Sequence, residues 1–518
     1  MGVFDAIANR LGYESQKNVL AREQEAHAKR EAVNTFKRTF SAALHNRLTG
    51  NWSGSVSSIN AEIEFGLPVM RNRSRGLVIN NEYAARYMHM LNTHVVGPNG
   101  FRLQVRGGGY AGGKFALDTI GNSIVEQSFA LWSEKGSCEV TGKLSFKEVC
   151  ELMITGAARD GEYLVRKIRG VNAGPYGFLL QVLPIDKLDH TYRAALANGN
   201  IVRMGIEYDS MGKVAAYYLW GTVPNDFDFR ILSTKRERVP ADDIYHGFRT
   251  LHPDQIRGVP WMHPVMARLN MLHAYQDAAV VAARLGASKA GFFTTPENDG
   301  TALADAKDST TGDLYMDVEP GVFQTLPAGY GFESWNPEYP HANQESFLKL
   351  CLRGIAGGIN VAYNNLANDL EGVNFSSMRS GALEERDNWM MIQGWFTESF
   401  LSWVYRDWLE TALLAKAIKF PKGSVLPVTV LQKFSEHIWQ GRRWQWVDPE
   451  KDINANILAI NNKLKSRTQI VAEQGIDFED LMMQIKLEEE IAKANNVDLS
   501  PPPKPAAAPP SNTQSPAA

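Results

Sequence analysis

The clearest pattern in the sequence is a pair of helical segments with regularly spaced apolar side chains, separated by a polar loop. The first helix, over about residues 343–358, has apolar residues four positions apart at Phe347, Cys351 and Ile355. Gly357-Gly358 predicts its end, because glycine favours the backbone conformation that follows a helix.

The second helix is predicted from about residue 377 to residue 418, with aromatic residues seven positions apart at Trp389, Phe396 and Trp403. A helix of roughly 40 residues is about 60 Å long, well beyond the usual three turns. The residues between the helices, 368–374, are mostly polar, which is typical of a loop. A long helix with a loop at one end is more typical of a mechanical part than of a catalytic pocket.

The first half of the chain predicts a mixture of helices and short strands, so the fold class is α+β. Asn81 begins a helix, and apolar strands are predicted at 163–167, 178–183 and 215–220. The helix that opens at Pro260 has apolar residues on two faces, which implies neighbours on both sides.

The remaining segments differ in composition. Residues 1–50 form a charged helical arm, and residues 291–340 form a turn-rich acidic insert. Ser466 and Gln469 have the spacing of a capping box, so helices are expected after residue 450. Residues 498–518 are rich in proline and alanine and are expected to be disordered.

Composition narrows the possible functions. The chain has 518 residues, enough for more than one core, and a net charge of −3, which gives no general signal for tight nucleic-acid binding. Its three cysteines form no CxxC pair, and no apolar run approaches ~20 residues, so we expect no membrane span.

The candidate motifs for chemistry are weak. Gly108, Gly113 and Lys114 match G-x4-G-K, but Phe115 stands where a nucleotide-binding loop needs Ser or Thr for magnesium. Four histidines between residues 246 and 273 lack the spacing of a metal motif, and no nucleophile elbow occurs. We therefore expect no enzyme activity, no metal site and no cofactor.

Lys349 and Arg353 are four positions apart and share a helix face. In a monomer they are a minor surface feature. In a closed ring, each subunit would repeat them, and the pair would become two positive belts. The same multiplication applies to residues 368–374.

Several short motifs, spread in order over roughly residues 50–495, resemble the portal proteins of tailed double-stranded DNA phages, in particular the lambda-type group. The motifs are Arg71-Asn72-Arg73-Ser74-Arg75, Asn80-Asn81-Glu82-Tyr83-Ala84, Val95-Val96-Gly97, Gly100-Phe101-Arg102-Leu103, Gly161-Glu162-Tyr163, Arg257-Gly258-Val259-Pro260-Trp261 and Ile355-Ala356-Gly357-Gly358-Ile359. The long N-terminal arm has no clear match in that family.

The resemblance implies a portal fold, assembled as a usually dodecameric ring around a DNA channel. The parts it implies are a wing at 51–259, a first stem helix at 260–290, a clip at 291–340, a second stem helix at 341–366, a tunnel loop at 367–376, a long wing helix at 377–418, further wing strands at 419–449 and crown helices at 450–497.

The resemblance also implies functional residues and partners. The tunnel loop would touch DNA through Asn368, Asp369, Leu370, Glu371, Gly372, Val373 and Asn374, and the stem through Lys349 and Arg353. A clip surface with Asp305, Asp308 and Asp313 would dock the terminase large subunit and later a head–tail adaptor. The wing would meet the major capsid and scaffolding proteins. The ring would assemble in the host cytoplasm and lie in the virion, at one capsid vertex.

Two other interpretations stay open at this point. One is a phage adaptor or scaffold-like interaction protein without a channel. The other is a nucleotide-dependent packaging enzyme that uses residues 108–114. We also expect that Trp403→Asp would prevent folding or ring formation, because burying an unpaired carboxylate is costly.

Overall fold

The computed structural model describes residues 24–25, 57–111, 114–222, 235–287, 291–294, 306–307, 314–315, 331–334, 343–371, 375–421, 423–444, 449–474, 477–495 and 497. The chain divides into two units, Met1–Glu62 and Ile63–Ala518. Helix α3 (Ile59–Asn80) begins in the first unit, and the other named elements belong to the second.

The helices of the first half are α4 (Glu82–Leu91), α5 (Thr119–Trp132), α6 (Phe146–Asp160) and α7 (Met266–Ala287). A helix start was predicted near Asn81, and this residue caps α4, because its side chain accepts a hydrogen bond from the Ala84 N–H at 3.0 Å. A π-helical turn, η2 (Asn92–Val96), then ends at Gly97. Helix α7 starts six residues later than predicted, after an irregular turn that follows Pro260.

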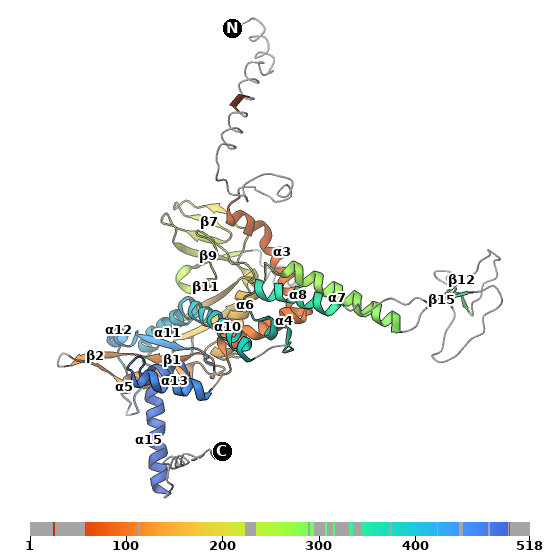
Figure 1. Cartoon of the computed structure of the whole chain (residues 1–518). Helices are drawn as coiled ribbons and strands as arrows, with labels where there is room; N and C mark the ends of the chain where they lie inside the picture. Colours follow the sequence, from red (N-terminus) through yellow and green to blue (C-terminus); the bar gives the residue numbers. More distant parts are fainter. Residues whose placement is uncertain are drawn as a thin grey trace, which may run out of the picture. The chain divides into compact units, whose positions relative to one another are not determined.

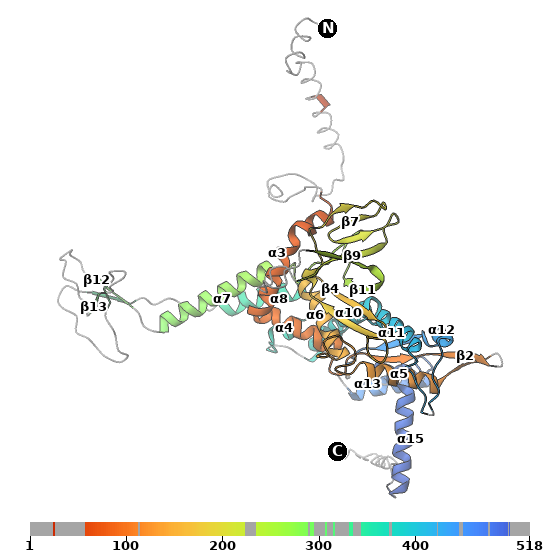
Figure 2. The same cartoon turned by 180° about the vertical axis from the view of Figure 1, so that it is seen from behind.

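The predicted helix pair is confirmed, with shifts at its ends. Helix α8 (Gln344–Gly358) is followed by the short α9 (Tyr363–Ala367). The long helix consists of α10 (Phe375–Phe396), a π-helical turn η5 (Thr397–Leu401) and α11 (Ser402–Leu414). Helix α8 lies alongside α7 in both Figure 1 and Figure 2.

Two antiparallel sheets form most of the β structure. A three-stranded sheet has the order β11 (Ile244–Phe248), β4 (Glu162–Arg169), β5 (Phe178–Leu183). A five-stranded sheet has the order β10 (Arg236–Pro240), β9 (Val214–Trp220), β8 (Ile206–Tyr208), β7 (Ile201–Arg203), β6 (Ala194–Ala195). Gly212 lies in the turn that connects β8 to β9, with a φ of 80° that glycine adopts readily.

The three-stranded sheet lies between two apolar cores. Along β4, Tyr163 and Val165 belong to the larger core, which includes the long helix, whereas Leu164 belongs to a smaller core under the five-stranded sheet. This alternation is the ordinary consequence of side chains pointing to opposite faces of a strand. Tyr245 and Ile244 of β11 divide in the same way.

Residues 419–444 depart from the prediction of several strands. They contain a 3₁₀ turn η6 (Val428–Val430), helix α12 (Leu431–Phe434) and one strand, β16 (His437–Gln440). Strand β16 pairs with β1 (Arg102–Val105), with Leu103 opposite Trp439. This pairing joins the late segment to the first half of the chain.

The glycine-rich segment is a β-hairpin. Strands β2 (Gly108–Ala111) and β3 (Lys114–Leu117) pair antiparallel, with Ala111 opposite Lys114. Lys114 therefore lies in a strand and does not follow a phosphate-binding turn into a helix, as a nucleotide-binding loop requires.

Within the acidic insert, the described residues form two antiparallel pairs, β12 (Gly291–Thr294) with β15 (Gly331–Ser334) and β13 (Ala306–Lys307) with β14 (Leu314–Tyr315). The C-terminal helices are α13 (Pro449–Asn461), α14 (Arg467–Glu473) and α15 (Phe478–Ala494). The capping box predicted at Ser466 is present, with Gln469 as its partner. In the described part of the chain, no helix combines the length and apolar character needed to cross a membrane.

Candidate functional site

The loop that precedes the long helix follows the short helix α9, which is packed against the rest of the protein. Leu366 of α9 is buried in the larger core. The Asn365 carbonyl accepts a hydrogen bond from Arg86 Nε at 3.3 Å, and the Asn365 side-chain amide donates to Glu385 of α10. Helix α9 is thus held on one side by α4 and on the other by the long helix.

Lys349 of α8 reaches across to this loop. Its ammonium nitrogen lies 2.6 Å from a carboxylate oxygen of Glu345, 2.9 Å from one of Glu371 and 3.5 Å from one of Asp369. Glu345 is one turn earlier on the same helix, whereas the other two carboxylates belong to the loop. The hydrogen bonds to Glu345 and Glu371 raise the pKa of Lys349 above its ordinary value.

Asp369 is oriented by further contacts. The Tyr363 hydroxyl donates a hydrogen bond to Asp369 at 2.6 Å, and the Glu371 N–H donates to the other oxygen of Asp369 at 3.0 Å. These two hydrogen bonds lower the pKa of Asp369. Arg353 lies over the Tyr363 ring, with its guanidinium carbon 5.4 Å from the ring centroid.

The structure describes only the first part of the predicted tunnel loop. Asn368 adopts a left-handed conformation (φ 53°) that ends α9, and the Leu370 side chain is exposed. Gly372, Val373 and Asn374 lie outside the described residues, as do Asp305, Asp308 and Asp313 of the acidic insert.

The predicted basic pair is on one face of α8, but its members differ. The three carboxylates around Lys349 outnumber its single positive charge. Arg353 is exposed and contacts an aromatic ring. Lys349 is for this reason the more neutralised of the two cations.

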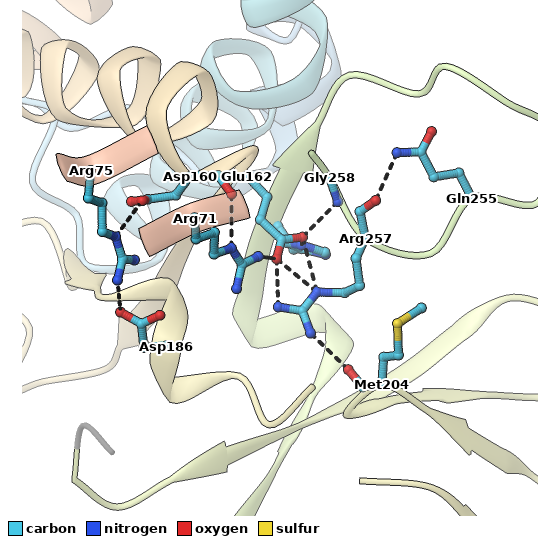
Figure 3. Close-up of polar contacts among 10 residues, drawn as sticks. Arg71, Arg75, Asp160, Glu162, Asp186, Met204, Gln255, Arg257 and Gly258 are labelled. Atoms are coloured by element: carbon cyan, nitrogen blue, oxygen red, sulfur yellow. Dashed lines mark hydrogen bonds and ion pairs between the residues drawn. The ribbon is translucent and has the colours of Figure 1, made fainter. Parts of the chain in front are cut away.

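Sequence reasoning missed a second cluster, which is centred on the buried carboxylate of Glu162 (Figure 3). Arg257 donates to it from Nε at 2.8 Å and from Nη2 at 2.5 Å, and Arg71 donates from Nη2. The Gly258 N–H and a ring nitrogen of His246 complete the shell, at 3.1 Å and 2.8 Å. The side chains of Glu162 and Arg257 are both fully buried.

The cluster extends to a neighbouring carboxylate. Arg75, one turn after Arg71 on α3, donates from Nε to Asp160 at 2.6 Å and from Nη1 to Asp186 at 2.8 Å. Arg71 Nε also donates to the Asp160 carbonyl at 2.9 Å. Helix α3 is thus tied to the end of α6 and the start of β4 by two arginines.

Electrostatics explain why Glu162 stays ionised. Burial by itself would raise the pKa of Glu162, but Arg257, Arg71 and His246 together hold that pKa well below its usual range. The backbone also fits closely here, because a Cβ atom at Gly258 would lie 2.1 Å from the Gly161 carbonyl oxygen. Glycine at position 258 is therefore needed for this approach.

Three of the sequence motifs meet at this cluster, although they are about 90 residues apart in the chain. Arg71 comes from the first motif, Glu162 from the Gly161-Glu162-Tyr163 motif, and Arg257 and Gly258 from the last before α7. In two of the motifs a charged residue lies beside a glycine, namely Glu162 after Gly161 and Arg257 before Gly258, but this local pattern does not indicate which charges pair.

Metal chemistry has no candidate site in this part of the molecule. Among the described residues, no group of three His, Cys, Asp or Glu side chains could hold a metal ion. His246 contacts Glu162, and a ring nitrogen of His263 lies 3.0 Å from the Pro260 carbonyl oxygen.

Comparison with known proteins decides between the open interpretations. Residues 45–393 match the family model described as phage portal protein, lambda family. The chain belongs to this family. The matched range includes the Glu162 cluster, α8, the loop and most of α10.

Two phage relatives agree with this family. This portal protein is 35% identical over 458 residues to the probable portal protein of Halomonas phage phiHAP-1, covering 87% of this chain and 86% of the relative. It is 20% identical over 471 residues to portal protein B of Escherichia phage lambda, covering 84% and 86%. A chain from the neck of an empty gene transfer agent particle is 12% identical, with a TM-score of 0.43, covering 78% of this chain and 93% of that one.

Proposed function

We propose that this phage portal protein assembles into a closed ring, of twelve copies as is usual in the family, at one vertex of the capsid, and that double-stranded DNA enters and leaves through its central channel. The observation that carries this proposal is the family match over residues 45–393. The ring is thereby a component of the virion, built in the host cytoplasm before DNA is packaged.

Unpartnered apolar side chains support assembly. Exposed large apolar residues of single chains are common, but here several recur along α7 and along the long helix. They include Met271, Val280 and Val281 on α7 and Leu383, Met390, Met391, Trp403 and Leu414 on the long helix. Neighbouring copies would cover these side chains and remove apolar surface from water.

The parts of the portal are assigned as the family pattern suggests. Helices α7 and α8 are the stem, 291–340 is the clip, 367–376 is the tunnel loop and 450–497 is the crown. The wing combines 51–259 with the long helix and 419–449. The pairing of β1 with β16 supports this grouping.

The proposed contacts with partners follow from these parts. The tunnel loop and Arg353 meet the passing duplex, whose phosphates are attracted weakly by exposed cations. The acidic clip, with Asp305, Asp308 and Asp313, docks the terminase large subunit during packaging and a head–tail adaptor afterwards. The wing meets capsid and scaffolding proteins.

The alternative of a nucleotide-dependent packaging enzyme loses its structural basis, because Lys114 lies in the β2–β3 hairpin. The alternative of an adaptor without a channel is displaced by the family match.

A deletion in the loop tests the DNA-channel role. Removing residues 371–373 should leave ring assembly intact, because α9 and α10 keep their own contacts, but should reduce the DNA retained per capsid. Leu370→Ser, which changes one exposed side chain of the loop, should give a smaller reduction. The measurement is DNA per particle at equal portal content. Full retention in the deletion variant would refute the role of this loop.

A further inference from the structure

The cluster around Lys349 suggests that this side chain does more than attract DNA, because it also contacts the loop. This inference rests on the proposed DNA channel. Lys349 offers three N–H donors, and the structure gives it three carboxylate partners. Two of them, Asp369 and Glu371, lie in the first part of the loop, so Lys349 connects the loop to α8.

The connection restrains the loop because its partners are themselves fixed. Asp369 is held by the Tyr363 hydroxyl at 2.6 Å, and the Asp369 N–H donates to the Asn364 carbonyl of α9 at 3.1 Å. Glu371 is linked to Asp369 by its own N–H at 3.0 Å. Residues 369–371 therefore form a compact turn with Lys349 as the cation that joins its two carboxylates.

The same contacts are open to competition. The Lys349 side chain is 26% exposed and that of Glu371 is 76% exposed, so water and ions reach the pair. Ion pairs in such surroundings are weak and are screened by salt. A DNA phosphate presents the same chemistry to an ammonium group as a carboxylate does, namely anionic oxygen acceptors.

We propose that Lys349 is a positioning residue that holds the first part of the tunnel loop against α8 through Asp369 and Glu371, and that phosphates of DNA in the channel release the loop by competing for the Lys349 ammonium. In this arrangement the loop carboxylates occupy the cation while no phosphate is near. An arriving phosphate takes their place, and residues 369–371 are then free to move away from α8.

Hydrogen exchange of the full-length protein tests the restraint directly, because two loop amides are hydrogen-bonded within the turn. They are the N–H groups of Asp369 and Glu371. In Lys349→Met, which keeps an unbranched side chain without charge, these amides should exchange about two- to fivefold faster than in the wild type. Arg353→Met is the matched control, since it removes a charge from the same face of α8 but leaves the carboxylates of the loop with Lys349.

Rescue separates the ion pair from general damage to α8. The conservative variant Lys349→Arg, which keeps a cation facing all three carboxylates, should keep the exchange rate of the turn near the wild-type value. Equal exchange rates in Lys349→Met and the wild type would overturn the restraint. An Arg353→Met variant with as large an effect as Lys349→Met would also overturn it, because the contact would not be specific to Lys349.

Inorganic tripolyphosphate serves as the probe for competition by phosphate. At an ionic strength matched with sodium chloride, tripolyphosphate should speed exchange of the turn in the wild type and not in Lys349→Met. If it does no more than sodium chloride, competition by phosphate is refuted. These measurements need no packaged DNA. A failure of the channel role would instead appear as full DNA retention in the loop deletion, with the exchange results unchanged.

Discussion

Replacing Glu162 by glutamine tests how much the buried cluster stabilises the fold. Glutamine has nearly the same shape but no charge, and its amide group would face the donors of Arg71 and Arg257. The two guanidinium groups would then be buried without a carboxylate between them. Removing one partner of a buried ion pair in this way costs about 3–5 kcal/mol.

That magnitude can be compared with the total free energy of unfolding, which is typically about 5–15 kcal/mol for a protein domain. The loss in Glu162→Gln would therefore be a large share of the total. The contribution of Glu162 also has a defined pH dependence. Because the folded-state pKa is held well below its usual range, this stability is present above about pH 4.5 and is lost as the pH falls through the folded-state value.

The assay is thermal unfolding followed by circular dichroism, at equal protein concentration and with the fraction of rings measured by light scattering, since assembly adds to apparent stability. The matched control is Glu237→Gln, which removes the partner of Arg166 at 2.8 Å in a half-exposed pair. The control should lose less than about 1 kcal/mol. If Glu162→Gln is no less stable than Glu237→Gln at neutral pH, the reasoning about the buried cluster is refuted.

Two further predictions concern the long helix and its neighbours. Trp403 is 53% exposed, so Trp403→Asp should change the free energy of unfolding by less than about 0.5 kcal/mol but reduce the fraction of rings in light scattering. Trp408 is buried, so Trp408→Asp should instead unfold the subunit. Burial, with a contribution from Arg442, lowers the pKa of His94 to about 4. The folded state therefore favours the neutral ring, and the protein should lose stability as the pH falls from about 6.5 toward 4. We expect a loss of about 1 kcal/mol between pH 7 and 5, reduced by the partial exposure of the ring, and a flatter thermal-stability profile in His94→Gln. An equally steep profile in that variant would contradict the assignment to His94.

Local signals in the sequence were sufficient for the helices near the loop. The four-residue spacing of Phe347, Cys351 and Ile355 predicted α8 to within one residue at its start, because that spacing depends only on the helical repeat. The capping box at Ser466 was predicted from the equally local spacing of Ser466 and Gln469.

The position of Trp403 shows where local spacing fails. Seven residues are slightly less than two helical turns, so residues seven apart drift around the helix. A π-helical turn, η5, lies between Phe396 and Trp403. Because its hydrogen bonds span five residues, this turn winds less per residue than an α-helix and increases the drift of Trp403 away from the face of Phe396. Phe396 is consequently buried and Trp403 is exposed. Of the two outcomes expected for Trp403→Asp, loss of folding or loss of ring formation, the exposure of Trp403 favours the second.

The Glu162 cluster could not be predicted from local patterns, because its members are brought together only by the folded chain. Arg71 and Glu162 are 91 positions apart, and Glu162 and Arg257 are 95 apart. Each of these residues lies in a recognisable motif, but nothing in the motifs pairs one carboxylate with two particular arginines. Likewise, the positions of Lys349 and Arg353 on one face were predictable, whereas the carboxylates that occupy Lys349 were not.

The two clusters use similar charged groups for opposite purposes, and the difference lies in burial. Glu162 and Arg257 are withdrawn from water, so separating them leaves an uncompensated charge and is strongly opposed. Lys349 and Glu371 remain in contact with water, so they can exchange partners at little cost. On the proposed function, a ring that holds its wing rigid while its loop yields to moving DNA would use both kinds of ion pair. The buried pair belongs where the structure must not move, next to the start of α7, and the exposed pair belongs at the loop. On the proposed function, an exposed ion pair in place of the Glu162 cluster, or a buried ion pair at the loop, would impair packaging even if every charge were conserved.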